Sequence, residues 1–418
     1  MAADADAVTV SNPRRALATI FAIVFVDLLG FGILIPVLPL YAEHFGASGA
    51  VVGLLLAAYS ATQFLFAPLL GRLSDDYGRR PILLLSLFGS VVAWTLFGLA
   101  DGLLVLFLAR LLAGAMGGNI ATTQAYIADI TPPERRAQGL GLVGAAFGLG
   151  FVFGPALGGV FSSPGVVAAV DGALPGLVPI TQFTLPSFAA AVISALNLVA
   201  AFVVLPETRR TTQAAETGSR LAMLRDALED PALAGLVASF FLFSLAFSGM
   251  ESMFVLFTGD QFGFGPAMNG YVLAYVGVII AIVQGGLVGR IVPRFGEVRI
   301  AVLGVVLTGV TIGLLPFTAS LLALLAVLTP LAVGNAFANV SLTTLVSRSA
   351  SADEQGGAFG LTQSAGSLAR IVGPVAAGVL YTAVAYWSPF VAGAVVLVPV
   401  LLILSSRVFG SDESAVAG

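Results

Sequence analysis

The sequence predicts an all-α membrane protein with twelve transmembrane helices arranged as two six-helix pseudo-repeats. Three observations support this fold class. Of the 418 residues, 58% are hydrophobic and 10% are charged, whereas soluble domains are about half apolar and a quarter charged. Apolar stretches long enough to cross a hydrocarbon core of about 30 Å recur along the whole chain. Features of the first half also return in the second half, in the same order.

Charge clusters and Gly/Pro turns separate the apolar stretches. We expect helices at about 17–41, 50–71, 81–100, 103–128, 138–161, 184–205, 232–257, 267–289, 299–317, 320–346, 357–381 and 387–407. The longest polar stretch, 206–231, divides them six and six. We therefore expect an N-terminal bundle at 1–206, a cytoplasmic linker at 207–231 with a short helix at 219–229, and a C-terminal bundle at 232–418. The connection at 162–183 is Gly/Pro-rich and is expected to be an external loop.

Arginine predicts the orientation, because cytoplasmic loops hold an excess of positive charge. Sixteen of the eighteen arginines fall in alternate loops and in the two tails, and only Arg110 and Arg370 lie inside spans. This partition places both termini in the cytoplasm and the protein in the cell membrane.

The halves repeat short motifs. Gly71-Arg72 aligns with Gly289-Arg290, Gly78 with Gly296, and Gly154-Pro155 with Gly373-Pro374. Duplicated membrane bundles bind substrate between their halves and move it by rocking one half on the other. The repeat therefore indicates a secondary transporter.

The composition argues against several other function classes. Cysteine is absent, His44 is the one histidine, and no basic run is present, so neither a metal cluster nor a nucleic-acid partner is expected. We expect a monomer that is not an enzyme and needs no cofactor or metal. Its partners are expected to be a small-molecule substrate, protons and the lipid bilayer.

The segment from Gly71 to Pro81 carries the first motif. Gly71 and Gly78 suit a tight loop, and Asp75 can pair with arginine or cap a helix. The segment resembles the G-x-L-x-D-x-x-G-R-[KR]-P signature of the major facilitator superfamily, although Asp76 stands where relatives have a basic residue. We interpret it as a charge latch between helices that involves Arg79 and Arg80; the alternative is a solvated hairpin.

The fifth span carries the second motif. Small residues there permit close helix approach, and Pro155 allows a bend. The pattern G-x8-G-x3-G-P-x2-G-G resembles that of the superfamily's proton-coupled exporters; ordinary glycine packing is the alternative. It is formed by Gly141, Gly150, Gly154, Pro155, Gly158 and Gly159.

Charged residues inside spans are the candidates for proton coupling. An ionised Asp27 would cost about 3 kcal/mol or more in the bilayer, so we expect it to face a cavity and carry a proton. Arg110 matches the superfamily's fourth-span arginine and would favour proton release from a nearby acid. A static Asp27–Arg110 pair is the alternative. Glu251 is a second proton site or a substrate contact, Arg370 is its partner or an anion contact, and either is otherwise structural.

Polar and aromatic residues in the spans are candidates for lining a substrate cavity, and each is otherwise a helix-packing contact. The substrate-binding set comprises Glu251, Arg370, Gln63, Asn119, Gln124, Tyr271, Tyr275, Asn335, Asn339 and Gln363.

Together with the stretches 125–131, 144–150 and 255–258, these motifs resemble the drug:proton antiporters of the superfamily, most closely the tetracycline-exporter branch. The resemblance implies proton-coupled export of small amphiphilic or drug-like molecules by alternating access, and hence drug resistance. Ala93 and Thr308 occupy positions where that branch has aspartates, so we expect another substrate, lipophilic or cationic. A proton-symporting importer, a uniporter and a transport-dead sensor remain alternatives.

Overall fold

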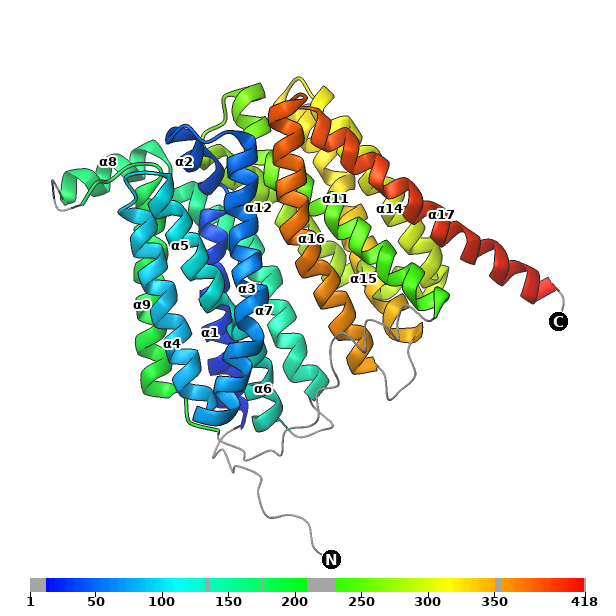
Figure 1. The fold of residues 1–418 in the computed structure, drawn as a ribbon, viewed down its shortest axis with the longest axis horizontal. Coiled ribbons are helices and arrows are strands. Elements are labelled where there is room, and N and C mark those ends of the chain that lie inside the picture. Colours follow the sequence, from blue (N-terminus) through cyan, green and yellow to red (C-terminus); the bar gives the residue numbers. More distant parts are fainter. Residues whose placement is uncertain are drawn as a thin grey trace, which may run out of the picture. The chain divides into compact units, whose positions relative to one another are not determined.

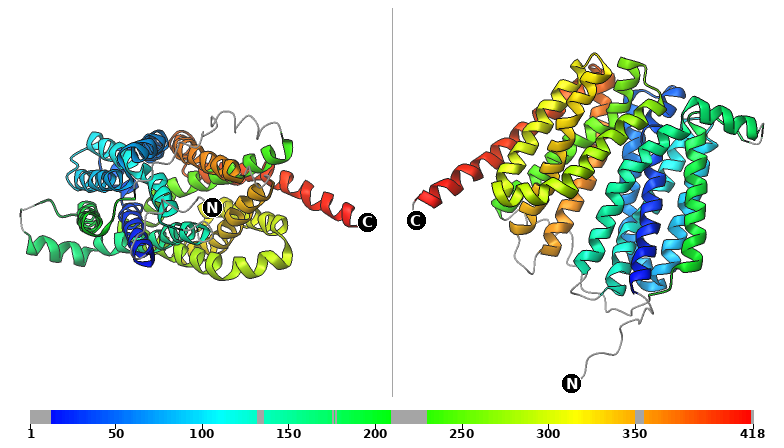
Figure 2. Two further views of the ribbon diagram at one scale, coloured as in Figure 1. Left: turned by 90° about the horizontal axis from the view of Figure 1, so that it is seen from below. Right: turned by 180° about the vertical axis from the view of Figure 1, so that it is seen from behind.

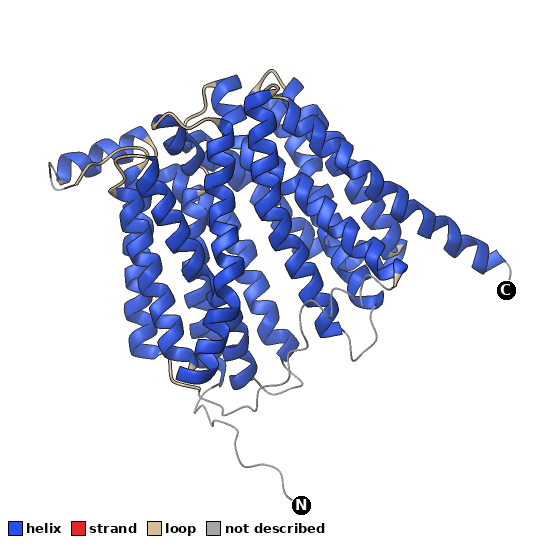
Figure 3. Ribbon diagram, viewed as in Figure 1, coloured by secondary structure: helices blue, strands red, loops and turns tan. Residues whose placement is uncertain are grey.

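The computed structural model describes residues 13–131, 136–174, 176, 178–208, 230–349 and 355–416. Within these ranges every regular element is a helix (Figure 3). Twelve segments are long and apolar enough to cross a membrane, as the sequence predicts. Most of the expected linker, including the helix expected at 219–229, lies outside the described residues.

The chain divides into two compact units. Unit 1 comprises residues 1–45, 58–215 and 265–274, and unit 2 comprises 46–57, 216–264 and 275–418. The helices of unit 1 include α1 (Pro13–Leu34), α2 (Leu38–His44), most of α3 (Gly49–Tyr77), α4 (Arg79–Gly98), α5 (Leu103–Met116), α6 (Ile120–Ile130), α7 (Arg136–Phe161), α8 (Pro164–Ala173) and α9 (Thr184–Val204). In this unit α4 packs on α9 and α5, and α1 packs on α7 and α9 (Figure 1).

Unit 2 is also a helical bundle. It contains α11 (Pro231–Phe262), the C-terminal part of α12 (Pro266–Ile282), the π-helical turn η3 (Val283–Leu287), α13 (Val288–Phe295), α14 (Glu297–Leu314), the 3₁₀ turn η4 (Leu315–Phe317), α15 (Leu321–Ser349), α16 (Gln355–Ala383) and α17 (Ser388–Val416). Helix α11 packs on α16 and α17, and α14 packs on α15 and α17. At its start, α11 is capped by Asp230, whose Oδ1 accepts from Ala232 N at 2.8 Å.

Two expected spans are interrupted. The first breaks between α1 and α2 at residues 35–37, because Pro36 has no N–H to continue the helix. The fourth contains the 3₁₀ turn η1 (Gly117–Asn119) between α5 and α6. This turn brings Asn119, 6% exposed, into the interior of unit 1.

The connection expected to be an external loop contains a helix, which corrects that prediction. Helix α8 begins at Pro164, a residue type whose fixed φ suits the first turn. It projects sideways from the ends of the longer helices of its unit (Figure 2), and none of its residues is buried.

The turn between the second and third spans also differs from expectation. Gly71 is not a turn residue, because α3 continues as a helix to Tyr77. The whole turn is made by Gly78, with φ +104°, which a residue with a side chain adopts only with strain. Gly296 takes the same role before α14, with φ +83°. The repeat seen in the sequence is therefore present in the backbone.

Glycines bring helix backbones into direct contact in unit 1. A Cβ on Gly154 of α7 would overlap Gly32 of α1, and a Cβ on Gly158 would overlap the backbone of Ile33. Gly150 faces Leu28 in the same seam, whereas Gly159 faces Gly270 of α12 within unit 1. Small residues are what permits such close approach in a membrane.

We call the contact of Gly150, Gly154 and Gly158 with α1 the glycine seam. Unit 2 has its counterpart, because a Cβ on Gly373 of α16 would meet Leu245 O and Gly249 N of α11 at 3.0 and 3.1 Å. Pro155 and Pro374 each directly follow a seam glycine inside a helix.

The glycine seam makes a stability prediction. Gly154→Ala should lower the free energy of unfolding by about 1–3 kcal/mol, because the added methyl group must push α1 away. Thermal unfolding of the detergent-purified protein measures the change. Gly144→Ala on the same helix is the matched control: nothing lies within 4 Å of its Cβ position, so we expect it to be neutral or stabilising. Equal effects of the two variants would contradict close packing at the seam.

Candidate functional site

Asp27 lies beside a small cavity inside unit 1. The cavity has a volume of about 30 Å³. It is lined by Ile23, Val24, Asp27, Leu28, Phe31, Tyr59, Leu83, Leu87, Ser90, Trp94, Ala113, Gly117, Asn119, Ile120, Thr123 and Val143. These residues come from α1, α3, α4, α5, η1, α6 and α7. An acidic side chain thus lines a space between the helices of unit 1.

Two neutral donors contact the Asp27 carboxylate. Ser90 Oγ donates to Oδ1 and Asn119 Nδ2 donates to Oδ2, each at 3.4 Å. Both bonds are long, because N–H···O bonds usually measure about 2.9–3.0 Å and O–H···O bonds about 2.7–2.8 Å. The carboxylate is therefore held by weak neutral contacts and is not locked by a cation.

Arg110 contacts aromatic rings and not the acid. Its Cζ lies 4.8 Å from the ring centroid of Tyr59 and 5.6 Å from that of Phe31. Both rings line the cavity, and the arginine is 6% exposed. No ion pair within 4.0 Å joins the described side chains of Asp27 and Arg110. The two charges therefore face the same group of residues without the direct pairing of the static alternative.

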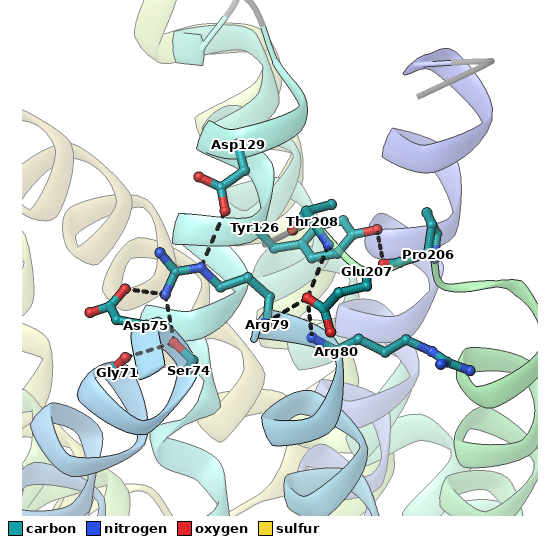
Figure 4. Close-up of polar contacts among 10 residues, drawn as sticks. All are labelled: Gly71, Ser74, Asp75, Arg79, Arg80, Tyr126, Asp129, Pro206, Glu207 and Thr208. Carbon is teal, nitrogen blue, oxygen red and sulfur yellow. Dashed lines mark hydrogen bonds and ion pairs between the residues drawn. The ribbon is translucent and has the colours of Figure 1, made fainter. Parts of the chain in front are cut away.

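Arg79 is the centre of the charged cluster at the α3–α4 turn (Figure 4). Its guanidinium pairs with Asp75 of α3 and, through Nε, with Asp129 Oδ2 of α6 at 3.2 Å. Nη1 also donates to Ser74 Oγ at 2.6 Å. Side chains of α3 and α6 thus contact one buried arginine of α4.

Glu207, which the sequence interpretation did not select, fixes the backbone of the same turn. Its Oε1 accepts from the N–H groups of Arg79 at 3.0 Å, Arg80 at 3.4 Å and Thr208 at 3.0 Å (Figure 4). It therefore satisfies donors at the start of α4 that Gly78 has no side chain to cap. Nearby, Arg80 Nη2 donates to Phe202 O at 2.6 Å.

Unit 2 repeats the α4–α6 ion pair with its polarity reversed. Arg79 is the first residue of α4, and Asp129 is the penultimate residue of α6. In the same places α14 has Glu297 and α15 has Arg348. Glu297 Oε1 and Arg348 Nη1 are 2.8 Å apart. An ion pair thus joins the corresponding helix ends in both repeats. The positive charge lies on the first helix of the pair in unit 1 and on the second in unit 2.

The charged residues expected within the C-terminal spans lie on two packed helices. Glu251 is half-buried on α11, and Arg370 is exposed on α16. Arg370 Nη2 donates to Ser367 Oγ at 3.3 Å.

The other expected lining residues are divided between the two units. Asn119 lines the Asp27 cavity, and Gln63 Nε2 donates to Gly117 O at 3.0 Å beside it. Tyr275 bonds Thr329 Oγ1 at 2.6 Å within unit 2. Of the rest, Asn335 is buried, Gln124 is half-buried, and Tyr271, Asn339 and Gln363 are exposed.

Among the cavity-lining residues that the sequence did not predict are Ser90, Trp94 and Thr123. A polar side chain inside an apolar span was the available signal for Ser90 and Thr123. Trp94 gave none, because tryptophan is common in membrane helices.

The family model of the Major Facilitator Superfamily matches residues 20–374 and 285–416. The chain belongs to the Major Facilitator Superfamily. Among its relatives, a class E tetracycline resistance protein of Escherichia coli is 32% identical over 379 residues, which cover 88% of this chain and 89% of that protein. Multidrug resistance protein 1 of Bacillus subtilis (strain 168) is 29% identical over 85% of this chain and 87% of the relative.

Solved structures of superfamily transporters share the fold. The human organic anion transporter MFSD10 is 27% identical, with a TM-score of 0.67 over 94% of this chain and 99% of that one. A bacterial homologue of the human lysosomal transporter Spinster is 15% identical, with a TM-score of 0.76 over 95% and 96% of the two chains. The protein is therefore an integral multi-pass membrane transporter of this superfamily.

The reversed ion pairs predict unequal stability effects. Asp129→Asn should lower the free energy of unfolding by about 1–3 kcal/mol, because Arg79 stays buried and loses a charged partner. Glu297→Gln should cost less than about 1 kcal/mol, because the Arg348 side chain is 67% exposed. Chemical or thermal unfolding in detergent compares them. A larger loss for Glu297→Gln would contradict this ranking.

Proposed function

We propose that this transporter exports small amphiphilic or drug-like molecules in exchange for protons. The observation that carries the proposal is Asp27, an acid within an apolar span that lines a cavity and has no cation paired to it among the described residues. Ionisable residues in such places usually belong to ion or substrate pathways. The names of the tetracycline and multidrug resistance relatives support export of drug-like compounds.

The charge of the Asp27 carboxylate explains how this residue would couple proton movement to substrate movement. An ionised carboxylate is costly inside the membrane, and binding a proton removes that charge. Substrate arrival near Arg110 and the aromatic rings would then favour proton release on the cytoplasmic side. Glu251 and Arg370 would contribute to proton handling or to substrate choice from unit 2.

The motif residues have a conformational role in this proposal. Alternating access requires two six-helix bundles, 1–206 and 232–418, that rock as wholes. The Arg79 cluster with Asp75 and Arg80 would stabilise one state through charge contacts. Gly150, Gly154 and Gly158 would keep α7 close to α1 during the movement.

The proposal also includes the oligomeric state, the membrane and the orientation of the protein. The protein would act as a monomer in the cytoplasmic membrane with both termini in the cytoplasm, joined by the linker at 207–231. It would need no cofactor and would not be an enzyme.

Proteoliposomes with an imposed pH gradient test proton antiport. We expect ethidium, a permanently cationic amphiphile, to accumulate in vesicles with an acidic interior. Protein-free liposomes control for leakage and for trapping of weak bases. Accumulation that needs sodium or no gradient would contradict antiport, and accumulation in the same direction as the protons would instead support an importer.

Asp27→Asn tests the assignment of the proton site. The variant should fold and bind the transported compound, because the amide keeps the shape of the side chain. Its gradient-driven transport should fall by about 100-fold or more, the scale for loss of a proton-transfer group. Glu251→Gln, measured in the same assay, compares the acid of unit 2. Undiminished active transport by Asp27→Asn would remove Asp27 from the mechanism.

A further inference from the structure

Trp94 of α4 presents a buried donor that the protein does not satisfy. Its side chain is 3% exposed and lines the Asp27 cavity. Among the described residues, no acceptor lies within hydrogen-bond distance of Nε1. A buried donor without a partner costs about 1–3 kcal/mol. Buried polar groups of this kind in native proteins usually bind water.

The indole N–H of Trp94 lies near Gly30, which follows Asp27 by about one turn of α1. A Cβ on Gly30 of α1 would be 3.2 Å from Trp94 Nε1 and 3.3 Å from Ser194 Oγ. Ser194 Oγ, on α9, is also buried without a partner. Two unsatisfied polar groups therefore face the α1 backbone at the point where Gly30 has no side chain.

The cavity has the size and chemistry for water and not for a drug molecule. Its volume of about 30 Å³ compares with about 10–15 Å³ for each water molecule. The indole N–H is a donor only. A water that accepts from Trp94 keeps both of its protons and can donate one toward the Asp27 carboxylate.

We propose that this cavity is a water site in which Trp94 Nε1–H orients water toward Asp27, and that this water carries the proton to and from the carboxylate. Trp94 is thus a positioning residue. When Asp27 releases its proton, its O–H bond breaks, the proton adds to the water oxygen, and one of that water's own protons passes to the next water. The inference rests on the proton role proposed for Asp27.

Few groups near the cavity can titrate. Asp27 and Tyr59 are the titratable residues of the lining, and Arg110 stacks on the rings of Phe31 and Tyr59. The lining residues contributed by α4, η1, α6 and α7 carry no charge. A change of Trp94 emission with pH must therefore come from one of these few side chains. Its loss in Asp27→Asn would assign it to Asp27.

Fluorescence of the full-length protein tests the water site without any substrate. The chain has two tryptophans, Trp94 and Trp387, so Trp387→Phe leaves Trp94 as the sole reporter. We expect the Trp94 emission to change with pH, and the change to be absent when Asp27→Asn is added. Trp94→Phe, which leaves Trp387, is the control and should give no such response. Emission that ignores pH, or a response that persists with Asp27→Asn, would overturn the proposal.

A shape-matched replacement separates positioning from packing. β-(3-Benzothienyl)alanine at position 94 keeps the two-ring shape and removes the N–H. We expect gradient-driven ethidium accumulation to slow about threefold to tenfold, the range for one hydrogen bond, while ethidium exchange at equal pH keeps its rate. An unchanged gradient-driven rate would overturn the role of Trp94, as would equal slowing of both rates.

The two assays also separate this inference from the proposed function. A Trp94 response linked to Asp27, in a protein that shows no gradient-driven transport of any compound, would support the water site and refute antiport. Gradient-driven transport with no Trp94 response would support antiport and refute the water site.

Discussion

Backbone contact through glycine between α1 and α7 is the constraint on which the rest of unit 1 depends. Gly32 and Gly154 meet without side chains between them, so the distance between these helices is set by the main chain. Asp27 lies on α1 just before this contact. The glycine seam therefore fixes the position of α1 along α7 and the rotation of α1 about its own axis. These in turn fix the position of the Asp27 carboxylate relative to Ser90 and Asn119.

The charged groups of the protein follow two different physical rules. At the helix ends, Arg79 and Glu297 find opposite charges on the neighbouring helix, and the pairs tie corresponding elements of the two repeats. Within the spans, Asp27 is held by neutral donors and Arg110 by aromatic rings. The charges at these helix ends are therefore paired with opposite charges, whereas Asp27 and Arg110 within the spans contact neutral groups.

The reversal of the ion pair shows how a duplicated fold can diverge without losing a contact. Coulomb attraction is the same whichever helix carries the positive charge, so the exchange keeps the link between helix ends. The surrounding potential does change sign, because the guanidinium begins α4 in one repeat and ends α15 in the other. Burial differs too, since the Arg79 side chain is 10% exposed and that of Arg348 is 67% exposed. The two turns are therefore similar in geometry and unlike in electrostatics.

By itself, the sequence determined the membrane class, the number of spans, the superfamily and the intramembrane charges, because each of these depends on local hydropathy or on a short motif. It did not reveal that Gly71 lies in a helix, that α8 forms in the connection at 162–183, or that Glu207 caps α4. Those features depend on backbone geometry and on contacts between residues distant in the chain. Only the tertiary structure decided that Asp27 meets Ser90 and Asn119 and not Arg110, and that Trp94 lines the same cavity. Helix rotation and depth set such contacts, and in a span that is apolar on every side the sequence pattern does not specify them.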